Sequence, residues 1–276
     1  MSHSSRSVAL VTGGARRVGA CVACALAEQG YAVAIHANAS TQSAETIAGG
    51  IRDRGGEAIV LAADLSDDEQ TEGLIKRVHG HFGQIDALVN SAAIWQPKPL
   101  EETTADDLRR HLEINTVAMW SCCKQVGLIM AGQQQGGAIV NLGDWATARP
   151  YADYSAYFPS KGAVEALTRS MAVELSQRNS YVRVNAILPG PVMLPPDMPA
   201  AERERAIAGT LVRREGSPDH IADAVLFLLR NDFVTGVCLP VDGGRTICPQ
   251  DSSSWIAPRS ERVAVDVIGS RSEPRL

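Results

Sequence analysis

Short apolar runs alternate along this chain with longer stretches in which apolar and polar residues recur at helical spacing. The apolar runs lie at 7–11, 31–35, 58–61, 85–89, 138–141, 182–187 and 237–241. Helices are predicted over 18–29, 45–54, 68–82, 105–130 and 155–177, with two more after a proline-rich loop. Strands without polar alternation, separated by helices, are typical of a parallel sheet covered on both faces. The pattern therefore predicts a single-domain α/β fold, a doubly wound parallel sheet of about seven strands.

Composition narrows the class of protein. Of the 276 residues, 45% are hydrophobic and 21% are charged, as in ordinary globular proteins. The net charge of −5 argues against a nucleic-acid-binding protein. No apolar run approaches the roughly 20 residues of a membrane span, and the N-terminus has no signal-peptide core, so we expect a cytoplasmic protein without a membrane partner. The six cysteines and six histidines form no ligand set, and we propose no metal site.

The run from Tyr157 to Lys161 carries the most specific chemical pattern. Two residues four apart lie on one face of a helix, one turn apart. An ammonium beside a phenol lowers the pKa of the phenol, so Lys161 is expected to prepare Tyr157 to donate a proton to a carbonyl or an imine. Asp144 stands thirteen residues upstream (157 − 144). If Ser155 is the N-cap of this helix, Pro159 falls at its first turn, where proline is tolerated.

A glycine-rich turn follows the first strand and opens a helix. It runs from Val11 to Gly19 and contains Gly13, Gly14 and two arginines. Glycines in such a turn let the backbone approach a pyrophosphate, and the helix N-terminus favours negative charge. The turn predicts a dinucleotide site.

The end of the second strand indicates which dinucleotide. An acidic residue there would hold the 2′-hydroxyl of NAD, and the segment 36–40 has none. Arg17, with Arg16, can supply positive charge to a 2′-phosphate, and Asn38 and Ser40 can donate hydrogen bonds. We therefore expect NADPH. The alternative is two solvated arginines beside a neutral strand end.

Taken together, the motifs resemble the short-chain dehydrogenase/reductase family, whose fold is Rossmann-like, and the resemblance implies a domain over residues 1–247. The motifs are Thr12-Gly13-x3-Arg17-x-Gly19, Ala63-Asp64-Leu65, Val89-Asn90-Ser91-Ala92, Asn115, Tyr157-x3-Lys161, Pro189-Gly190 and Val241-Asp242-Gly243-Gly244. The family usually has glycine at Arg17 and serine at or beside Asp144. Both departures resemble the pteridine reductase branch, which includes trypanosomatid pteridine reductases and bacterial dihydromonapterin reductases.

The resemblance implies a role for each matching residue. Tyr157 would donate the proton, Lys161 would bind the nicotinamide ribose, Asn115 would hold a water, and Asp144 would bind Tyr157 and the substrate. Trp95 would stack on a pterin ring, or would simply pack at a loop. The implied substrate residues are Trp95, Asp144, Leu194, Asp197 and Met198. The implied cofactor residues are Gly13, Arg16, Arg17, Val18, Gly19, Asn38, Ser40, Asp64, Leu65, Asn90, Ala92, Tyr157, Lys161, Pro189, Gly190 and Val192.

Some positions depart from the trypanosomatid enzymes. Val192 lacks the hydroxyl that these enzymes have, and Ala39 stands where they carry a basic residue. Ala93 also offers no hydroxyl on the cofactor side. These departures bear on the strength of the NADPH preference.

Three functions remain open from the sequence. The first is an NADPH-dependent reductase of a pterin, such as a dihydropterin, dihydromonapterin or a folate. Asp144 supports it, because a pterin needs a proton on nitrogen and a carboxyl group can pass protons. The second is a carbonyl reductase of the same fold acting on a 3-oxoacyl thioester or a sugar, with Asp144 as a drifted serine. The third is a non-catalytic NADPH-binding regulator.

The last residues continue beyond the usual end of the family. We expect 248–276 to be a largely disordered tail, because it is rich in Ser, Arg and Pro, with a possible strand at 263–268. By resemblance the protein would be a homotetramer.

Overall fold

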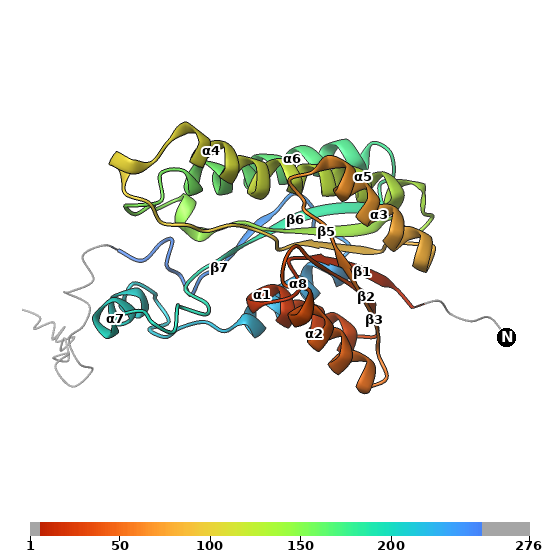
Figure 1. The fold of residues 1–276 in the computed structure, drawn as a ribbon, viewed down its shortest axis with the longest axis horizontal. Coiled ribbons are helices and arrows are strands. Elements are labelled where there is room, and N and C mark those ends of the chain that lie inside the picture. Colours follow the sequence, from red (N-terminus) through yellow and green to blue (C-terminus); the bar gives the residue numbers. More distant parts are fainter. Residues whose placement is uncertain (1–5, 250–276) are drawn as a thin grey trace, which may run out of the picture.

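A computed structural model describes residues 6–249, which fold around one parallel sheet of seven strands (Figure 1). The strands are β1 (Val8–Thr12), β2 (Ala32–Ala37), β3 (Glu57–Ala62), β4 (Ala87–Asn90), β5 (Gly137–Leu142), β6 (Val182–Pro189) and β7 (Cys238–Val241). Their order is β3-β2-β1-β4-β5-β6-β7. The order reverses between β1 and β4, and ligands of such sheets bind outside the carboxyl ends of the strands at this point. The predicted fold class is confirmed.

Helices cover both faces of the sheet. They are α1 (Arg17–Glu28), α2 (Thr41–Asp53), α3 (Asp68–Phe82), α4 (Ala105–Leu112), α5 (Ala118–Gly132), α6 (Tyr157–Ser176), α7 (Ala200–Ala208) and α8 (Pro218–Arg230). One layer holds α1, α2 and α8, and the other holds α3 to α6 (Figure 1). The short α7 stands apart from both layers, near the carboxyl end of β7 (Figure 1).

Each strand is apolar throughout because each of its faces meets a helix layer. Along β1, Leu10 belongs to the core under α3, α5 and α6, while its neighbour Val11 belongs to the core under α1, α2 and α8. Along β4, Leu88 likewise belongs to the first of these cores and Val89 to the second. Side chains of successive strand residues point to opposite faces, so a doubly covered strand has no polar side.

Three predicted helix boundaries are wrong. Helix α2 begins at Thr41 rather than at residue 45. The predicted helix 105–130 is interrupted by a π-helical turn, Glu113–Val117, between α4 and α5. Helix α6 begins at Tyr157 with Ala156 at its N-cap, so Ser155 does not cap it. Pro159 is the third residue of α6, where its missing N–H is one of the four that a helix leaves unpaired.

The described chain remains packed slightly beyond the expected domain end. Cys248 is buried, and its carbonyl accepts a 2.6 Å hydrogen bond from Arg149. The rest of the expected tail, residues 250–276 with the possible strand at 263–268, lies outside the described residues. Within residues 6–249 no helix has the length and apolar character needed to cross a membrane.

Candidate active site

A cleft of about 1190 Å³ opens at the carboxyl ends of the strands. It gathers most of the residues predicted from sequence, although they come from all parts of the chain. The predicted residues that line it are Gly13, Arg16, Arg17, Val18, Gly19, Asn38, Ser40, Asp64, Leu65, Ala92, Trp95, Asp144, Tyr157, Lys161, Pro189, Gly190, Val192, Leu194 and Met198. The glycine-rich turn, Tyr157 and Asp144 all belong to this set.

The glycine-rich turn leaves no room for side chains. Gly13 has a φ of +64°, and a Cβ there would lie 2.8 Å from the Cα of Ala92. A Cβ on Gly19 would lie 2.3 Å from the Gly13 carbonyl oxygen. No side chain among the described residues caps the start of α1, and its first turn holds no acidic residue. The turn therefore presents helix N–H groups and a positive dipole end to the cleft, which fits a pyrophosphate.

His36, at the end of β2, fixes this turn in place. Its Nδ1 accepts a 3.2 Å hydrogen bond from the backbone N–H of Gly13. Its Nε2 lies 3.0 Å from the carbonyl oxygen of Ala63, so Nε2 carries the proton of the neutral ring. Burial lowers the pKa of His36, which favours this neutral form. His36 belongs to no motif of the sequence and was not predicted as a site residue.

Arg17 occupies the position where the family usually has glycine, and its backbone reflects this. Its φ is +51°, in the left-handed region that glycine adopts most readily. Its guanidinium is exposed and donates a 2.7 Å hydrogen bond to the carbonyl of Met193, in the loop after β6. Arg17 thus joins the glycine-rich turn to the loop after β6, and both segments line the cleft.

Tyr157 and Asp144 are directly paired. The Tyr157 hydroxyl donates a 2.6 Å hydrogen bond to Oδ2 of Asp144. The other carboxylate oxygen, Oδ1, accepts a 2.8 Å bond from the N–H of Ala146, which fixes the side chain at the start of a 3-10 turn. Lys161 is buried and donates from Nζ to the carbonyl of Leu142 at 2.7 Å. The phenol and the carboxylate thus form a pair, and Lys161 lies one helical turn after Tyr157 on α6.

The predicted net lowering of the Tyr157 pKa is wrong for this arrangement. Burial raises the pKa of Tyr157, and the charge and hydrogen bond of Asp144 raise it further. A carboxylate that accepts the phenolic proton stabilises the neutral phenol. Tyr157 is thus held in its protonated form, as a proton donor must be.

Asn115 lies outside the cleft wall and joins three elements. Its Nδ2 donates to the Ile94 carbonyl and to the Ser160 hydroxyl, each at 3.0 Å, and its Oδ1 accepts from the Ile94 N–H at 2.8 Å. It sits within the π-helical turn. Such turns are frequent at functional sites. The side chain ties the loop after β4 to α6, close to Tyr157.

Comparison with known proteins agrees with this geometry. A family model described as "Enoyl-(Acyl carrier protein) reductase" matches residues 13–246. The chain belongs to the short-chain dehydrogenase/reductase family. A solved short-chain dehydrogenase/reductase from Serratia marcescens is 31% identical, with a TM-score of 0.79, over 88% of this chain and all of that one (100%). This family membership makes the protein an oxidoreductase that uses NAD or NADP.

Curated relatives carry several different activities in their names. Cis-4-hydroxycyclohexanecarboxylate dehydrogenase of Sinomonas cyclohexanicum is 38% identical over 87% of this chain and 96% of the relative. Pteridine reductase 1 of Leishmania tarentolae is 33% identical over 87% and 96%. Human 3-oxoacyl-[acyl-carrier-protein] reductase is 32% identical over 86% and 97%. Substrate preference must therefore be argued from this chain's own residues.

Three residues predicted for the site of this short-chain dehydrogenase/reductase do not line the cleft. Asn90, expected to hold the cofactor ribose, is buried and donates to Oδ1 of Asn141 at 2.9 Å. Asn115 lies behind the cleft wall, as described above. Asp197 is exposed at the edge of the loop before α7 and is absent from the cleft lining.

Sequence reasoning missed an aromatic wall. Tyr154 stacks on Trp95, with ring centroids 5.1 Å apart and planes 13° apart. Tyr151 packs edge-on against Tyr154, and the Arg245 guanidinium lies over Trp145, 4.7 Å from the ring centroid. All of these side chains line the cleft. A sequence signal was present, because aromatic residues make up only 5% of the chain yet crowd into the segment 145–158.

The buried ammonium of Lys161 makes the free energy of unfolding depend on pH. Burial lowers the pKa of Lys161 to about 8 from its usual 10.5, against the opposing charge of Asp144. Between these values the unfolded chain binds more protons than the folded one, so the unfolding free energy should rise with pH, by about 3 kcal/mol in all. Over the same range the rate of the oxidoreductase reaction should fall if Tyr157 exchanges the proton, because the Lys161 ammonium that stabilises a phenolate is lost.

Urea unfolding and kcat measured from neutral to alkaline pH test both trends. The matched variant is Lys161→Met, which keeps the length of the side chain without an ionisable group. It should lose this pH-dependent gain in stability. An equal gain in Lys161→Met would assign the titration to another group.

Proposed function

We propose that this protein is an NADPH-dependent reductase that transfers hydride to a dihydropterin-like substrate. The observation that carries the proposal is the 2.6 Å hydrogen bond from the Tyr157 hydroxyl to the carboxylate of Asp144. Reduction of a pterin C=N bond needs a proton on nitrogen, and a carboxylate can also accept hydrogen bonds from the ring N–H groups. A serine hydroxyl could accept such a hydrogen bond, but it carries no charge and does not pass protons at neutral pH.

The chain's own residues fit the dinucleotide. Gly13, Gly19 and the first turn of α1 would hold the pyrophosphate, and Lys161 would bind the nicotinamide ribose. Asn38, Ser40 and Arg17 surround the place where the adenosine end would lie, and no carboxylate stands at the end of β2 to repel a 2′-phosphate. When bound, the reduced nicotinamide supplies the hydride.

Tyr157 would donate the proton, and Asp144 and Lys161 would assist it. The raised pKa keeps the phenol protonated until substrate arrives. The hydroxyl then turns its proton from Asp144 to the substrate nitrogen, and the Lys161 ammonium stabilises the phenolate that remains. Asp144 is free in that state to accept a ring N–H of the substrate. The face of Trp95 that is not stacked on Tyr154 is available to a flat heteroaromatic ring.

A carbonyl reductase is the second candidate. It is favoured by the similarity to a hydroxycyclohexanecarboxylate dehydrogenase and to a 3-oxoacyl reductase. The two candidates differ in what they require of Asp144, because a ketone needs only a neutral hydrogen-bond donor at its oxygen.

Substitution of Asp144 separates the two candidates. Asp144→Ser should lower kcat/KM for a dihydropterin by about 10²-fold, as expected for loss of a group that assists proton transfer. Turnover of an acetoacetyl thioester should be unchanged or higher. The assay follows NADPH absorbance with dihydrobiopterin, dihydromonapterin, dihydrofolate and the thioester in parallel.

Asp144→Asn is the matched control, because it keeps the hydrogen bond to Ala146 and the shape of the side chain. It should fold normally and share the loss of pterin turnover. Thioester turnover by the unmodified protein without any pterin turnover would reject the pterin proposal in favour of the carbonyl reductase.

The NADPH preference is tested at Arg17. Arg17→Gly relieves the left-handed backbone and removes the charge, so the preference for NADPH over NADH in kcat/KM should fall by about tenfold or more. Arg110→Ala, an exposed arginine of α4, is the control and should leave the ratio unchanged. An unchanged ratio in Arg17→Gly would assign phosphate recognition to other residues.

We also propose a homotetramer. Trp120 and Leu128 of α5 and Val173 of α6 expose large apolar side chains on the outer side of the helix layer. Sedimentation of the purified protein measures the assembly directly.

A further inference from the structure

A second pocket of about 310 Å³ lies beside the reaction centre, between the loop after β4 and helix α4. Lys98, Thr103 and His111 form part of its wall. Pro97 and Asp153 line both this pocket and the main cleft, so the two spaces adjoin. The residues of this pocket take no part in the chemistry described above.

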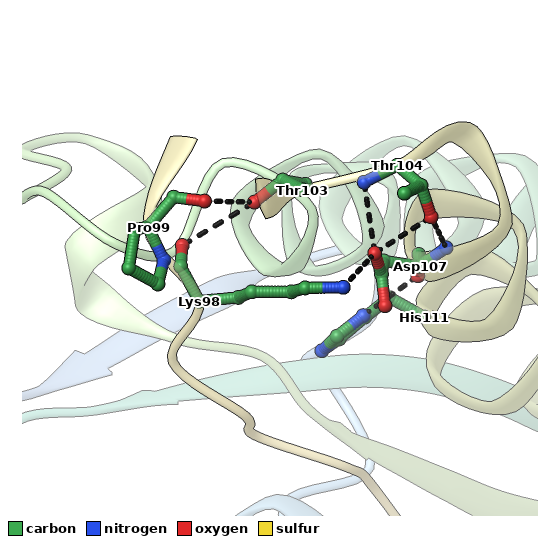
Figure 2. Close-up of polar contacts among 6 residues, drawn as sticks. All are labelled: Lys98, Pro99, Thr103, Thr104, Asp107 and His111. Carbon is green, nitrogen blue, oxygen red and sulfur yellow. Dashed lines mark hydrogen bonds and ion pairs between the residues drawn. The ribbon is translucent and has the colours of Figure 1, made fainter. Parts of the chain in front are cut away.

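His111, which lines this pocket, has a buried ring nitrogen without a hydrogen-bond partner among the described residues. The side chain is 3% exposed, and its Nδ1 lies 2.9 Å from the carbonyl oxygen of Asp107. That carbonyl can only accept, so Nδ1 carries the proton and Nε2 of the neutral ring is an acceptor. Nε2 has no hydrogen-bond partner within residues 6–249. Figure 2 shows the ring beneath Asp107, with its second nitrogen pointing away from that residue. A buried acceptor without a donor is costly, so this position favours an incoming donor.

Three other polar side chains of the pocket, those of Lys98, Thr103 and Asp107, are already paired (Figure 2). Lys98 Nζ forms a 2.7 Å ion pair with Oδ2 of Asp107, which also accepts from the Thr104 backbone N–H and hydroxyl. The Thr103 hydroxyl donates to the carbonyls of Pro99 and Lys98. Among the described residues, His111 Nε2 is the one buried side-chain nitrogen or oxygen without a hydrogen-bond partner.

The pocket lies within reach of a substrate on Tyr157. The His111 and Tyr157 rings meet edge to face, with centroids 6.2 Å apart. A ligand at the Tyr157 hydroxyl can thus extend past Pro97 and Asp153 toward His111. The pocket lining carries one formal positive charge, Lys98, and two negative charges, Asp107 and Asp153. That balance disfavours a carboxylate and suits an uncharged donor.

We propose that this pocket is a subsite for a hydroxylated side chain of the substrate, with His111 Nε2 accepting a hydrogen bond from one of its hydroxyls. The inference rests on the proposed pterin reductase function and adds which side chain the pterin carries. It selects an uncharged polyol chain over a methyl group, which offers no donor. It also selects against the glutamate tail of a folate, which brings carboxylates to a negative pocket.

The test compares two dihydropterins, one with a methyl and one with a trihydroxypropyl side chain. Binding to the protein with NADP is measured by calorimetry, and turnover with NADPH by absorbance. His111→Phe keeps the edge contact with Tyr157 but cannot accept a hydrogen bond, whereas His111→Gln restores an acceptor. The unmodified protein should prefer the hydroxylated substrate by about tenfold in Kd and KM. His111→Phe should lose this preference with kcat for the methyl substrate unchanged, and His111→Gln should recover part of it.

Nitrogen NMR of the unmodified protein gives a readout that does not depend on any variant folding. The Nε2 resonance of His111 should shift on addition of the hydroxylated pterin and stay in place with the methyl one. Equal affinity for the two pterins and an unmoved resonance would overturn the subsite while leaving pterin reduction intact. Failure of both pterins to bind or react would reject the proposed function, and the subsite with it.

Discussion

Replacement of Tyr157 with phenylalanine should lower kcat by about 10²–10⁴-fold, the range expected for a general acid. The loss follows from one atom, because the Tyr157 hydroxyl makes its hydrogen bond to Asp144 while the ring packs in the wall beside His111 and Phe158. Phenylalanine keeps that ring. Steady-state kinetics with the preferred substrate measure the effect, and dinucleotide affinity should change by less than about threefold.

The control for this variant is Tyr181→Phe, at an exposed tyrosine directly before β6. It should leave kcat unchanged. If Tyr157→Phe retained a rate within about tenfold of the unmodified protein, another group would have to donate the proton. The folded state of both variants is checked by thermal unfolding.

Gly19→Ala should disable the dinucleotide turn. A Cβ at this position would lie 2.3 Å from the Gly13 carbonyl oxygen and 3.1 Å from the Ser91 hydroxyl, so the turn must move away from α1. Overpacking of this kind costs about 1–3 kcal/mol of stability. Displacement of the turn by about 1 Å should cost about 10²-fold in kcat/KM, because the hydride donor is then misplaced. Dinucleotide titration and urea unfolding measure the two effects.

Gly73→Ala is the matched control in this case. Gly73 lies within α3, and no atom comes within 4 Å of the Cβ that alanine would add there. Alanine is a better helix former than glycine, so this variant should be more stable by about 0.5–1 kcal/mol with unchanged kinetics. Normal dinucleotide affinity in Gly19→Ala would mean that the turn adapts without losing its function.

The sequence by itself determined the parallel sheet, the glycine-rich turn and the pair Tyr157 and Lys161. Each strand is short and apolar because helices cover both faces of the sheet, and that requirement is visible residue by residue. The glycines of the dinucleotide turn and the pair Tyr157 and Lys161 were predictable because their spacing is local: a turn into a helix, and one turn of a helix. Helix starts were less predictable, since Ser155 is a good capping residue that α6 does not use.

Only the tertiary structure decided how these groups act on one another. The sequence predicted that Lys161 would lower the pKa of Tyr157, but burial and the contact with Asp144 raise it. Asn90 is part of a family motif and was predicted to bind the cofactor, but its side chain is buried and donates to Asn141. Contacts of this kind join residues far apart in the chain, and local spacing carries no information about them.

The pocket at His111 likewise depends partly on local sequence and partly on tertiary packing. Its residues come from the loop after β4, from α4 and from the segment before α6, and no motif unites them. The sequence determined a helix that places His111 one turn after Asp107. That its second nitrogen would be buried beside Tyr157, without a partner among the described residues, depends on how that helix packs against α6, because burial and pairing are properties of the folded chain.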